Sequence, residues 1–189
     1  MATPGSLIAS TSGATPAPTL AQWNLLPAKE AAALLLACCG SRAWAHAMAA
    51  RRPVADVSTL LTEADRIWWS LSADDWDEAF RNHPRIGERI GERKATASAE
   101  AQSATWSAQE QARAALASDD TQQRLRAGNA AYEARFGRIY IVCATGKTAE
   151  EMLAILEQRL ANDPATELRE AAEQQRQITR LRIQKWLNA

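Results

Sequence analysis

One of the two histidines in this 189-residue sequence, His83, stands where a proton-transfer group is expected. It precedes Pro84, and a residue before proline is disfavoured in the α conformation, so a helix should end just ahead of the imidazole. Arginines stand two residues before it and two residues after it. Because an imidazole changes charge near neutral pH, His83 is a candidate general acid or base. The alternative is a structural histidine that interacts favourably with the carboxyl end of a helix.

A second candidate is the segment Trp106-Ser107-Ala108-Gln109-Glu110-Gln111. Ser107 as an N-cap with Glu110 three residues later forms a capping box, which predicts that a helix begins here with Trp106 as its hydrophobic staple. A helix N-terminus also presents free backbone N–H groups that bind anions. The segment therefore predicts either a structural cap or a site for an anionic substrate group. Glu110 would serve both purposes only if it left the cap.

Arg159 is the third candidate, because it stands where an apolar residue is expected. Met152, Ile155 and Leu156 form a stripe at helical spacing, and position 159 continues that stripe by one more turn. A guanidinium there either extends along its stem to solvent or meets a carboxylate. If it instead binds substrate, it should line the same cavity as the histidine and the glutamate above.

The overall composition excludes several classes of protein. Lys plus Arg and Asp plus Glu number 22 each, so no net basic field would attract nucleic acid or an anionic membrane. The longest apolar run, Ala31–Cys39, is too short to span a bilayer. No Cys, His and carboxylate cluster has metal-ligand spacing, and no glycine-rich phosphate loop is present. We therefore expect no metal, no nucleotide, no nucleic acid and no membrane partner.

The cysteines indicate the compartment. Cys38, Cys39 and Cys143 are an odd number, and two of them are adjacent in sequence, which is typical of reduced thiols rather than of a disulfide framework. The first residues also lack the charged and apolar regions of a signal peptide. We therefore expect a cytoplasmic protein.

The chain divides into two parts. Residues 1–20 are rich in Ser, Thr, Ala, Pro and Gly, so they bury too little apolar surface to offset their ordering entropy and should form a flexible arm. Residues 21–189 should form one helical domain, since their length supports a single core. Start and stop signals predict helices over Pro27–Cys39, Arg42–Arg51, Asp56–Leu71, Ser72–Asn82, Ala108–Ala117, Asp119–Arg135, Thr148–Leu160 and from Pro164 nearly to the end.

Two segments between these helices are predicted not to be helical. Residues 85–105 are polar and contain the tandem sequence Ile-Gly-Glu-Arg, which predicts one long loop with a local duplication. Ile139–Cys143 is the one strand-like run, and a single strand cannot make a sheet, so it should be a buried extended connector. The predicted fold class is all-α, a single-domain helical bundle with one long loop and a flexible N-terminal arm.

Several short motifs in this order resemble the OHCU decarboxylase family, whose substrate is 2-oxo-4-hydroxy-4-carboxy-5-ureidoimidazoline and whose product is (S)-allantoin. The motifs are Asn82-His-Pro-Arg-Ile-Gly-Glu88, Trp106-Ser-x-x-Glu-Gln111, Phe136-Gly137, Ile141-Val-Cys-Ala-Thr-Gly-Lys-Thr-Ala149, Arg159-Leu-x-Asn162, Glu173-Gln174 and Ile178-Thr-x-Leu-Arg182. The resemblance covers roughly residues 20 to 187. It implies an all-helical, cofactor-free carboxy-lyase of urate degradation that forms a homodimer.

The resemblance also implies the roles of particular residues. His83 and Glu110 match catalytic positions, and the positions that contact substrate are Pro84, Ser107, Gln111, Ile139, Tyr140, Ile141, Val142, Cys143 and Arg159. The duplicated loop makes the interval between the two catalytic positions longer than in shorter family members. The N-terminal arm is also absent from the family pattern.

The substrate of that family has a C=N bond beside the carbon that carries its carboxylate, so it provides its own electron sink. Whether His83 or Glu110 protonates carbon stays open. Two other functions also stay open. A non-catalytic interaction module would have lost a motif residue, and a different lyase or hydrolase of ureide metabolism would differ only in its pocket.

Overall fold

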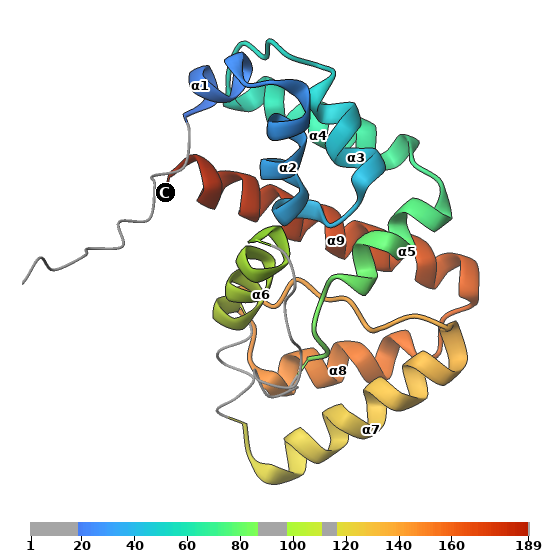
Figure 1. The fold of residues 1–189 in the computed structure, drawn as a ribbon. Helices are drawn as coiled ribbons and strands as arrows, with labels where there is room; N and C mark the ends of the chain where they lie inside the picture. The colour runs from blue at the N-terminus through green and yellow to red at the C-terminus, as the bar shows by residue number, and fades with distance from the viewer. Residues whose placement is uncertain (1–18, 87–97, 111–116, 189) are drawn as a thin grey trace, which may run out of the picture.

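Nine helices form the regular structure of residues 19–86, 98–110 and 117–188, the part of the chain that the computed structural model describes (Figure 1). They are α1 (Leu20–Leu25), α2 (Ala28–Cys39), α3 (Arg42–Ala49), α4 (Val57–Ser70), α5 (Ala73–Arg81), α6 (Ser98–Glu110), α7 (Asp119–Phe136), α8 (Ala149–Arg159) and α9 (Pro164–Leu187). No described residue lies in a strand, so the predicted all-α class is confirmed. None of the described helices is both long and apolar enough to cross a bilayer.

Local capping signals begin and end the helices as the sequence predicts. Ser72 and Asp75 form a capping box that begins α5, and Thr148 and Glu151 form another that begins α8. Pro164 is the first residue of α9, where its fixed φ suits a helix and its missing N–H costs no bond. The glycines that follow α2 and α7 are left-handed, as helix-ending glycines commonly are.

The predicted N-terminal arm lies outside the described residues except at its last two positions. Thr19 caps α1, and Leu20 is its first residue. The helix places Trp23 in the interior, where its ring meets the edge of Trp186 with 6.1 Å between ring centroids. This apolar contact offsets the entropy cost of ordering the residues around it.

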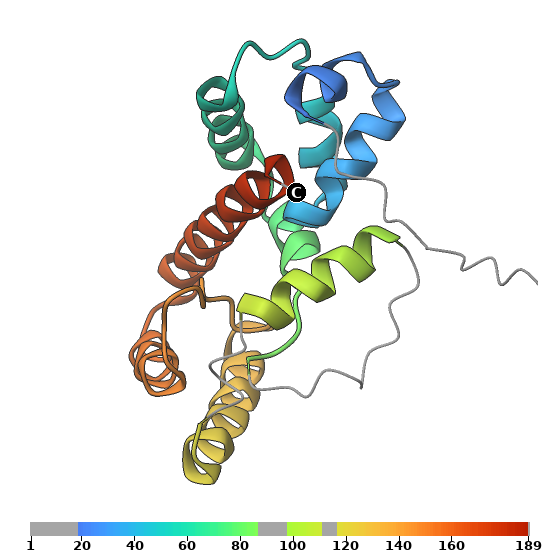
Figure 2. The same cartoon turned by 90° about the vertical axis from the view of Figure 1, so that its left-hand side faces the viewer.

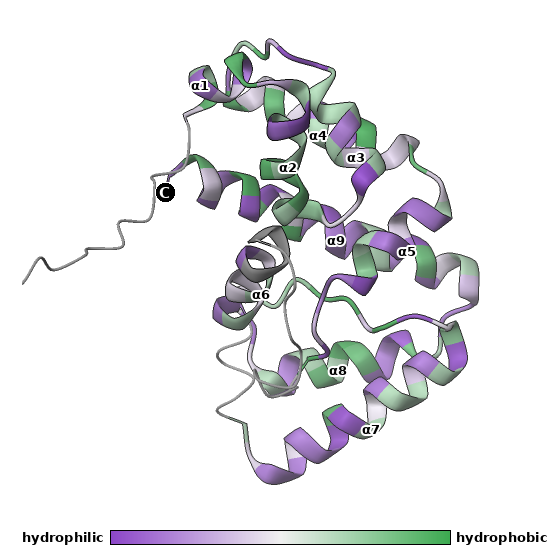
Figure 3. Cartoon of the chain, viewed as in Figure 1, coloured by the Kyte–Doolittle hydropathy of each residue, from purple (hydrophilic) through white to green (hydrophobic). Residues whose placement is uncertain are grey.

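The apolar side chains form two cores. The larger core joins α1–α5 to α9 and contains the buried tryptophans Trp23, Trp44, Trp68, Trp76, Trp106 and Trp186. The smaller core lies between α7 and α8 and includes Leu125, Tyr132, Phe136, Met152 and Leu156. Figure 3 shows that the residues of α2 are largely hydrophobic, whereas those of α7 are largely hydrophilic. A hairpin of two amphipathic helices thus stands beside a larger helical body.

Helix α9 and one extended segment connect the two cores. Figures 1 and 2 show α9 running from α8, near its first residues, to α1 and α2, near its last. The extended segment lies between α7 and α8 in sequence and is buried, as predicted. Ile141 and Cys143 belong to the larger core, whereas Tyr140 and Val142 belong to the smaller one. This alternation is expected of an extended chain, whose successive side chains point in opposite directions.

Candidate active site

A small pocket lies where the two cores meet. The residues that line it come from the end of α5, the end of α6, the extended segment and α9. They are His83, Pro84, Ile86, Glu110, Tyr140, Ile141, Val142, Ala144 and Ile178. The fold therefore brings together six of the eleven residues that the sequence analysis assigned to a site.

His83 reaches the pocket from the turn that ends α5. Its N–H donates to the Phe80 carbonyl at 3.0 Å, and the helix stops before Pro84 as predicted. The preceding Asn82 anchors this turn, because its Nδ2 donates to the Gly40 carbonyl at 2.8 Å. A Cβ on Gly40, whose φ is +86°, would lie 2.9 Å from Asn82, so this close approach requires glycine. The result is an oriented imidazole that is 6% exposed.

Glu110 reaches the pocket from the end of α6 and is held there by α9. Arg182 Nε donates to one carboxylate oxygen at 3.2 Å, and Arg182 Nη2 donates to the other at 2.9 Å. Lys185 Nζ lies 3.4 Å from the first oxygen. The side chains of Arg182 and Glu110 are only 1% and 7% exposed. A two-point bond between buried planar groups fixes the orientation of the carboxylate at the pocket.

The predicted capping box at Ser107 and Glu110 is wrong. Helix α6 begins at Ser98, so both residues lie near the end of that helix and not in its first turn. Ser107 Oγ accepts a hydrogen bond from Arg182 Nη2 at 2.8 Å instead of one from a backbone N–H. The sequence before it contains Ala and Glu, which favour helix, and the contact with Arg182 anchors the helix on α9.

The same helix shortens the predicted long loop. Residues 98–105 are helical, and residues 87–97 of that loop lie outside the described residues. The predicted helix Ala108–Ala117 is also displaced, because α6 starts ten residues earlier and residues 111–116 lie outside the described part. Gln111 falls in that gap, so its predicted contact with substrate stays a prediction.

The wall segment (residues 140–144) supplies four of the residues that line the pocket. No described strand pairs with this segment, and side chains bind several of its main-chain groups. The Cys143 N–H donates to Gln174 Oε1 at 2.9 Å, and Lys147 Nζ donates to the Cys143 carbonyl at 2.8 Å. Arg159 Nη1 donates to the Ile141 carbonyl at 2.7 Å. The shape of this wall therefore depends on side chains from α8, α9 and the turn before α8.

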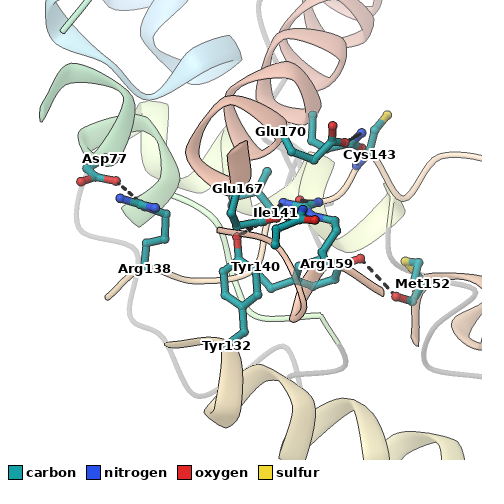
Figure 4. Close-up of polar contacts among 12 residues, drawn as sticks. Asp77, Tyr132, Arg138, Tyr140, Ile141, Cys143, Met152, Arg159, Glu167 and Glu170 are labelled. Atoms are coloured by element: carbon teal, nitrogen blue, oxygen red, sulfur yellow. Dashed lines mark hydrogen bonds and ion pairs between the residues drawn. The ribbon is translucent and has the colours of Figure 1, made fainter. Parts of the chain in front are cut away.

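Arg159 is buried and is not among the residues that line the pocket, so its predicted contact with substrate stays a prediction. Its Nε donates to Glu167 Oε1 at 2.9 Å, and Figure 4 shows the two side chains side by side. Glu167 is fully buried. Of the two alternatives for Arg159, solvent or a carboxylate partner, the structure therefore shows the carboxylate partner. Burial opposes the charge, but the hydrogen bonds to Glu167 raise the pKa of Arg159 above its ordinary value.

Three further predicted residues lie beside the pocket without lining it. Ile139 packs against the larger core, Cys143 is buried in that core, and Ser107 contacts Arg182. Across the described ranges, no three His, Cys, Asp or Glu side chains gather closely enough to hold a metal ion.

The match to a family model decides the family of this chain. The model described as OHCU decarboxylase matches residues 24–184, which include His83, Glu110, Arg159 and Arg182. The chain belongs to the OHCU decarboxylase family. The resemblance that the sequence motifs predicted is thereby confirmed.

Two curated relatives of this OHCU decarboxylase family member are similar over part of their length. The uric acid degradation bifunctional protein TTL of Arabidopsis thaliana is 38% identical over 150 residues, which cover 78% of this chain and 44% of the relative. The 2-oxo-4-hydroxy-4-carboxy-5-ureidoimidazoline decarboxylase of Amia calva is 41% identical over 61 residues, 32% of this chain and 35% of the relative. The matched regions thus span less than half of each curated relative.

Solved structures show the same fold. A crystal structure of OHCU decarboxylase in the presence of (S)-allantoin is similar with a TM-score of 0.69 and 31% identity, covering 83% of this chain and 99% of that one. A crystal structure of (S)-allantoin synthase is similar in fold with a TM-score of 0.66 at 20% identity, covering 90% and 54% of the two chains.

The sequence analysis of this OHCU decarboxylase family member missed the role of Arg182. The signal was present, because the buried residues Ile178, Ile183 and Trp186 place position 182 on the buried face of α9. An arginine on an apolar stripe is the pattern that singled out Arg159. Its partner Glu110 lies 72 positions away in sequence, so no local pattern connects the two.

The three thiols give a first testable expectation for this family member. Cys38, Cys39 and Cys143 are all free and buried. Burial raises the pKa of Cys39 to about 12 and raises the pKa of each of the other two above its ordinary value. Because the thiolate is the reactive form, we expect Ellman's reagent at pH 8 to leave the native protein largely unlabelled. All three thiols should react after unfolding in guanidinium, and rapid labelling of the native protein would contradict this burial.

Proposed function

We propose that this protein removes CO2 from 2-oxo-4-hydroxy-4-carboxy-5-ureidoimidazoline and releases (S)-allantoin in urate degradation. The observation that carries this proposal is the convergence of His83 and Glu110 on one pocket, within the region that matches the family. The similarity to a decarboxylase structure obtained in the presence of (S)-allantoin supports the choice of product.

The proposed reaction needs three proton transfers and the cleavage of one bond. When the bond to the carboxylate breaks, CO2 leaves and its electron pair forms a C=C bond with the neighbouring imine carbon, while the imine nitrogen takes a proton. The hydroxyl then loses its proton to become a carbonyl, and the former imine carbon gains a proton on one face. The substrate supplies its own electron sink, so we propose that no metal or organic cofactor takes part.

We assign the protein's contributions by position. His83 delivers the proton to carbon from one face, which sets the (S) centre. Glu110, oriented by Arg182, accepts a hydrogen bond from the substrate hydroxyl or ureido N–H and receives the hydroxyl proton. The wall segment and Pro84 enclose the ring.

Contacts outside the lining residues complete the proposal. We place the ureido arm toward Ser107 and Gln111, at the end of α6 and just beyond it. Ile139, just before the wall segment, and Cys143, within it, would contribute through their main chain.

We further propose that the protein is a cytoplasmic homodimer. Its buried free thiols support a reducing compartment, where cysteines are kept reduced. The family resemblance supports the homodimer, and light scattering of the purified protein at several concentrations tests it directly.

The proposed activity is tested with substrate generated enzymatically from urate. We expect the protein to accelerate decay of the substrate and to produce the circular dichroism bands of a single allantoin enantiomer. Without enzyme, protonation has no preferred face and the product should be racemic. Equal decay rates with and without the protein, or a racemic product at high protein concentration, would overturn the proposal.

A further inference from the structure

The wall segment is held by two side chains that do not themselves line the pocket. Arg159 donates to the Ile141 carbonyl at 2.7 Å, and Gln174 accepts from the Cys143 N–H at 2.9 Å. These two anchors flank Val142, which is one of the residues that line the pocket. Because the segment pairs with no described strand, such side-chain bonds decide where its main chain lies.

Arg159 is itself immobilised on every side. Its Nε and Nη2 both donate to Glu167 Oε1, and Nη2 lies 3.4 Å from the Tyr132 hydroxyl. The Tyr140 ring lies beside the guanidinium, with 5.0 Å between the Arg159 Cζ atom and the ring centroid (Figure 4). Nη1 is the donor that binds the main chain of the wall segment, at the Ile141 carbonyl. The planar fork of arginine can bridge a carboxylate and a carbonyl in this way, whereas lysine offers a single point charge.

Glu167 is held in turn by groups from two elements. The Tyr132 hydroxyl donates to Glu167 Oε1, and Asn162 Nδ2 donates to Glu167 Oε2 at 2.8 Å. Glu167 lies in the first turn of α9, so the helix that carries Arg182 also carries the group that orients Arg159. Helix α9 thereby orients the carboxylate of Glu110 through Arg182. It also holds the wall segment, because its Glu167 orients Arg159.

We propose that Arg159 is a positioning residue, held by Glu167, that sets the main chain at Ile141 and Val142 against the substrate without touching it. A buried ion pair often contributes no more stability than apolar side chains of the same volume, so stability alone does not account for the pair. The proposal rests on the proposed decarboxylase function. It replaces the direct substrate contact that the sequence resemblance implied for this arginine.

A positioning role and a contact role affect different kinetic constants. Loss of a direct contact that binds substrate and transition state equally raises KM and leaves kcat unchanged. Displacement of a pocket wall misaligns the bound substrate, which lowers kcat by roughly 10- to 100-fold. We therefore expect variants of the anchor to lower kcat by that amount while KM changes by less than about threefold.

The experiment compares two variants of the anchors with one control. Arg159→Met with Glu167→Gln removes both charges but keeps one acceptor oxygen, which can still accept from the Tyr132 hydroxyl. Gln174→Met removes the second anchor at a half-buried position. The control, Arg176→Met, removes ion pairs to Asp65 on α4 and to Glu173 on α9, and none of these three residues lines the pocket. We expect the control to keep kcat within about twofold, as surface ion pairs contribute little.

Amide hydrogen exchange provides a readout independent of activity. Both anchor variants should exchange faster in the peptide that covers residues 138–147, with the rest of the described chain unchanged. A drop in kcat with this local change supports the proposal. Normal kcat, or a rise in KM at normal kcat, overturns it. If the double variant fails to fold, Gln174→Met decides by the same criteria. If the wild type itself shows no decarboxylase activity, the proposed function fails, while the exchange measurement still tests the anchors.

Discussion

His83→Gln is expected to slow turnover of the proposed substrate by about 10²–10⁴-fold, the usual contribution of a general acid or base. Glutamine keeps the approximate size of imidazole and its hydrogen-bonding ability, but it cannot deliver a proton at neutral pH. The side chain lines the pocket and is almost fully buried, so no solvent-exposed group can take over its position easily. Initial rates at saturating substrate, followed by circular dichroism of the product, measure the loss.

The other histidine supplies the control for this variant. His46 lies exposed on α3, so His46→Gln should leave both activity and folding unchanged. A structural histidine near a helix end contributes at most about 2 kcal/mol, so His83→Gln should remain folded. If His83→Gln kept more than about one third of wild-type turnover, its role would be structural and the assignment of the proton donor would fail.

Glu110→Gln is expected to lower turnover by about 100-fold or more while the protein stays folded, because glutamine can still accept from Arg182 but cannot receive a proton. Glu110→Ala should in addition destabilise the protein. Among the described residues, it would leave the buried Arg182 guanidinium with the hydroxyls of Ser103 and Ser107 as its hydrogen-bond partners. Removing one partner of a buried ion pair costs about 3–5 kcal/mol, which lowers Tm by roughly 10 °C in a chain of this size.

Thermal unfolding and kinetics on the same samples separate these two effects. Glu173→Gln is the matched control, since Glu173 is also paired with an arginine of α9 but does not line the pocket. Full activity in Glu110→Gln would show that the carboxylate only holds Arg182. An unchanged Tm in Glu110→Ala would show that the ion pair contributes little to the fold.

The helix ends were predictable because the interactions that set them span only a few residues. The capping box at Thr148 joins two residues three positions apart, through bonds of 2.7 and 3.2 Å. These bonds need no partner from a distant part of the chain. The stop before Pro84 follows in the same way from a steric clash with the next residue. These local rules were enough to place His83 at a helix end.

The same kind of local rule failed at Ser107, because a motif does not record whether a helix has already begun. The pattern Ser-x-x-Glu occurs here inside α6, and the two side chains turn to Arg182 instead of to the backbone. Arg182 lies on another helix, more than seventy positions along the chain. Its choice of partner follows from how α6 packs on α9, and the sequence motif carries no information about that packing.

By itself, the sequence determined that this protein is helical, that an imidazole ends one helix, and that Arg159 stands on a buried stripe. Only the tertiary structure decided what Arg159 meets there. Fully buried Glu167, eight residues further on, and the Ile141 carbonyl, eighteen residues back, take the donors that the sequence analysis had assigned to substrate. The physical reason is that a buried charge must find a partner, and which of several distant partners comes within bonding distance depends on the folding of the whole chain.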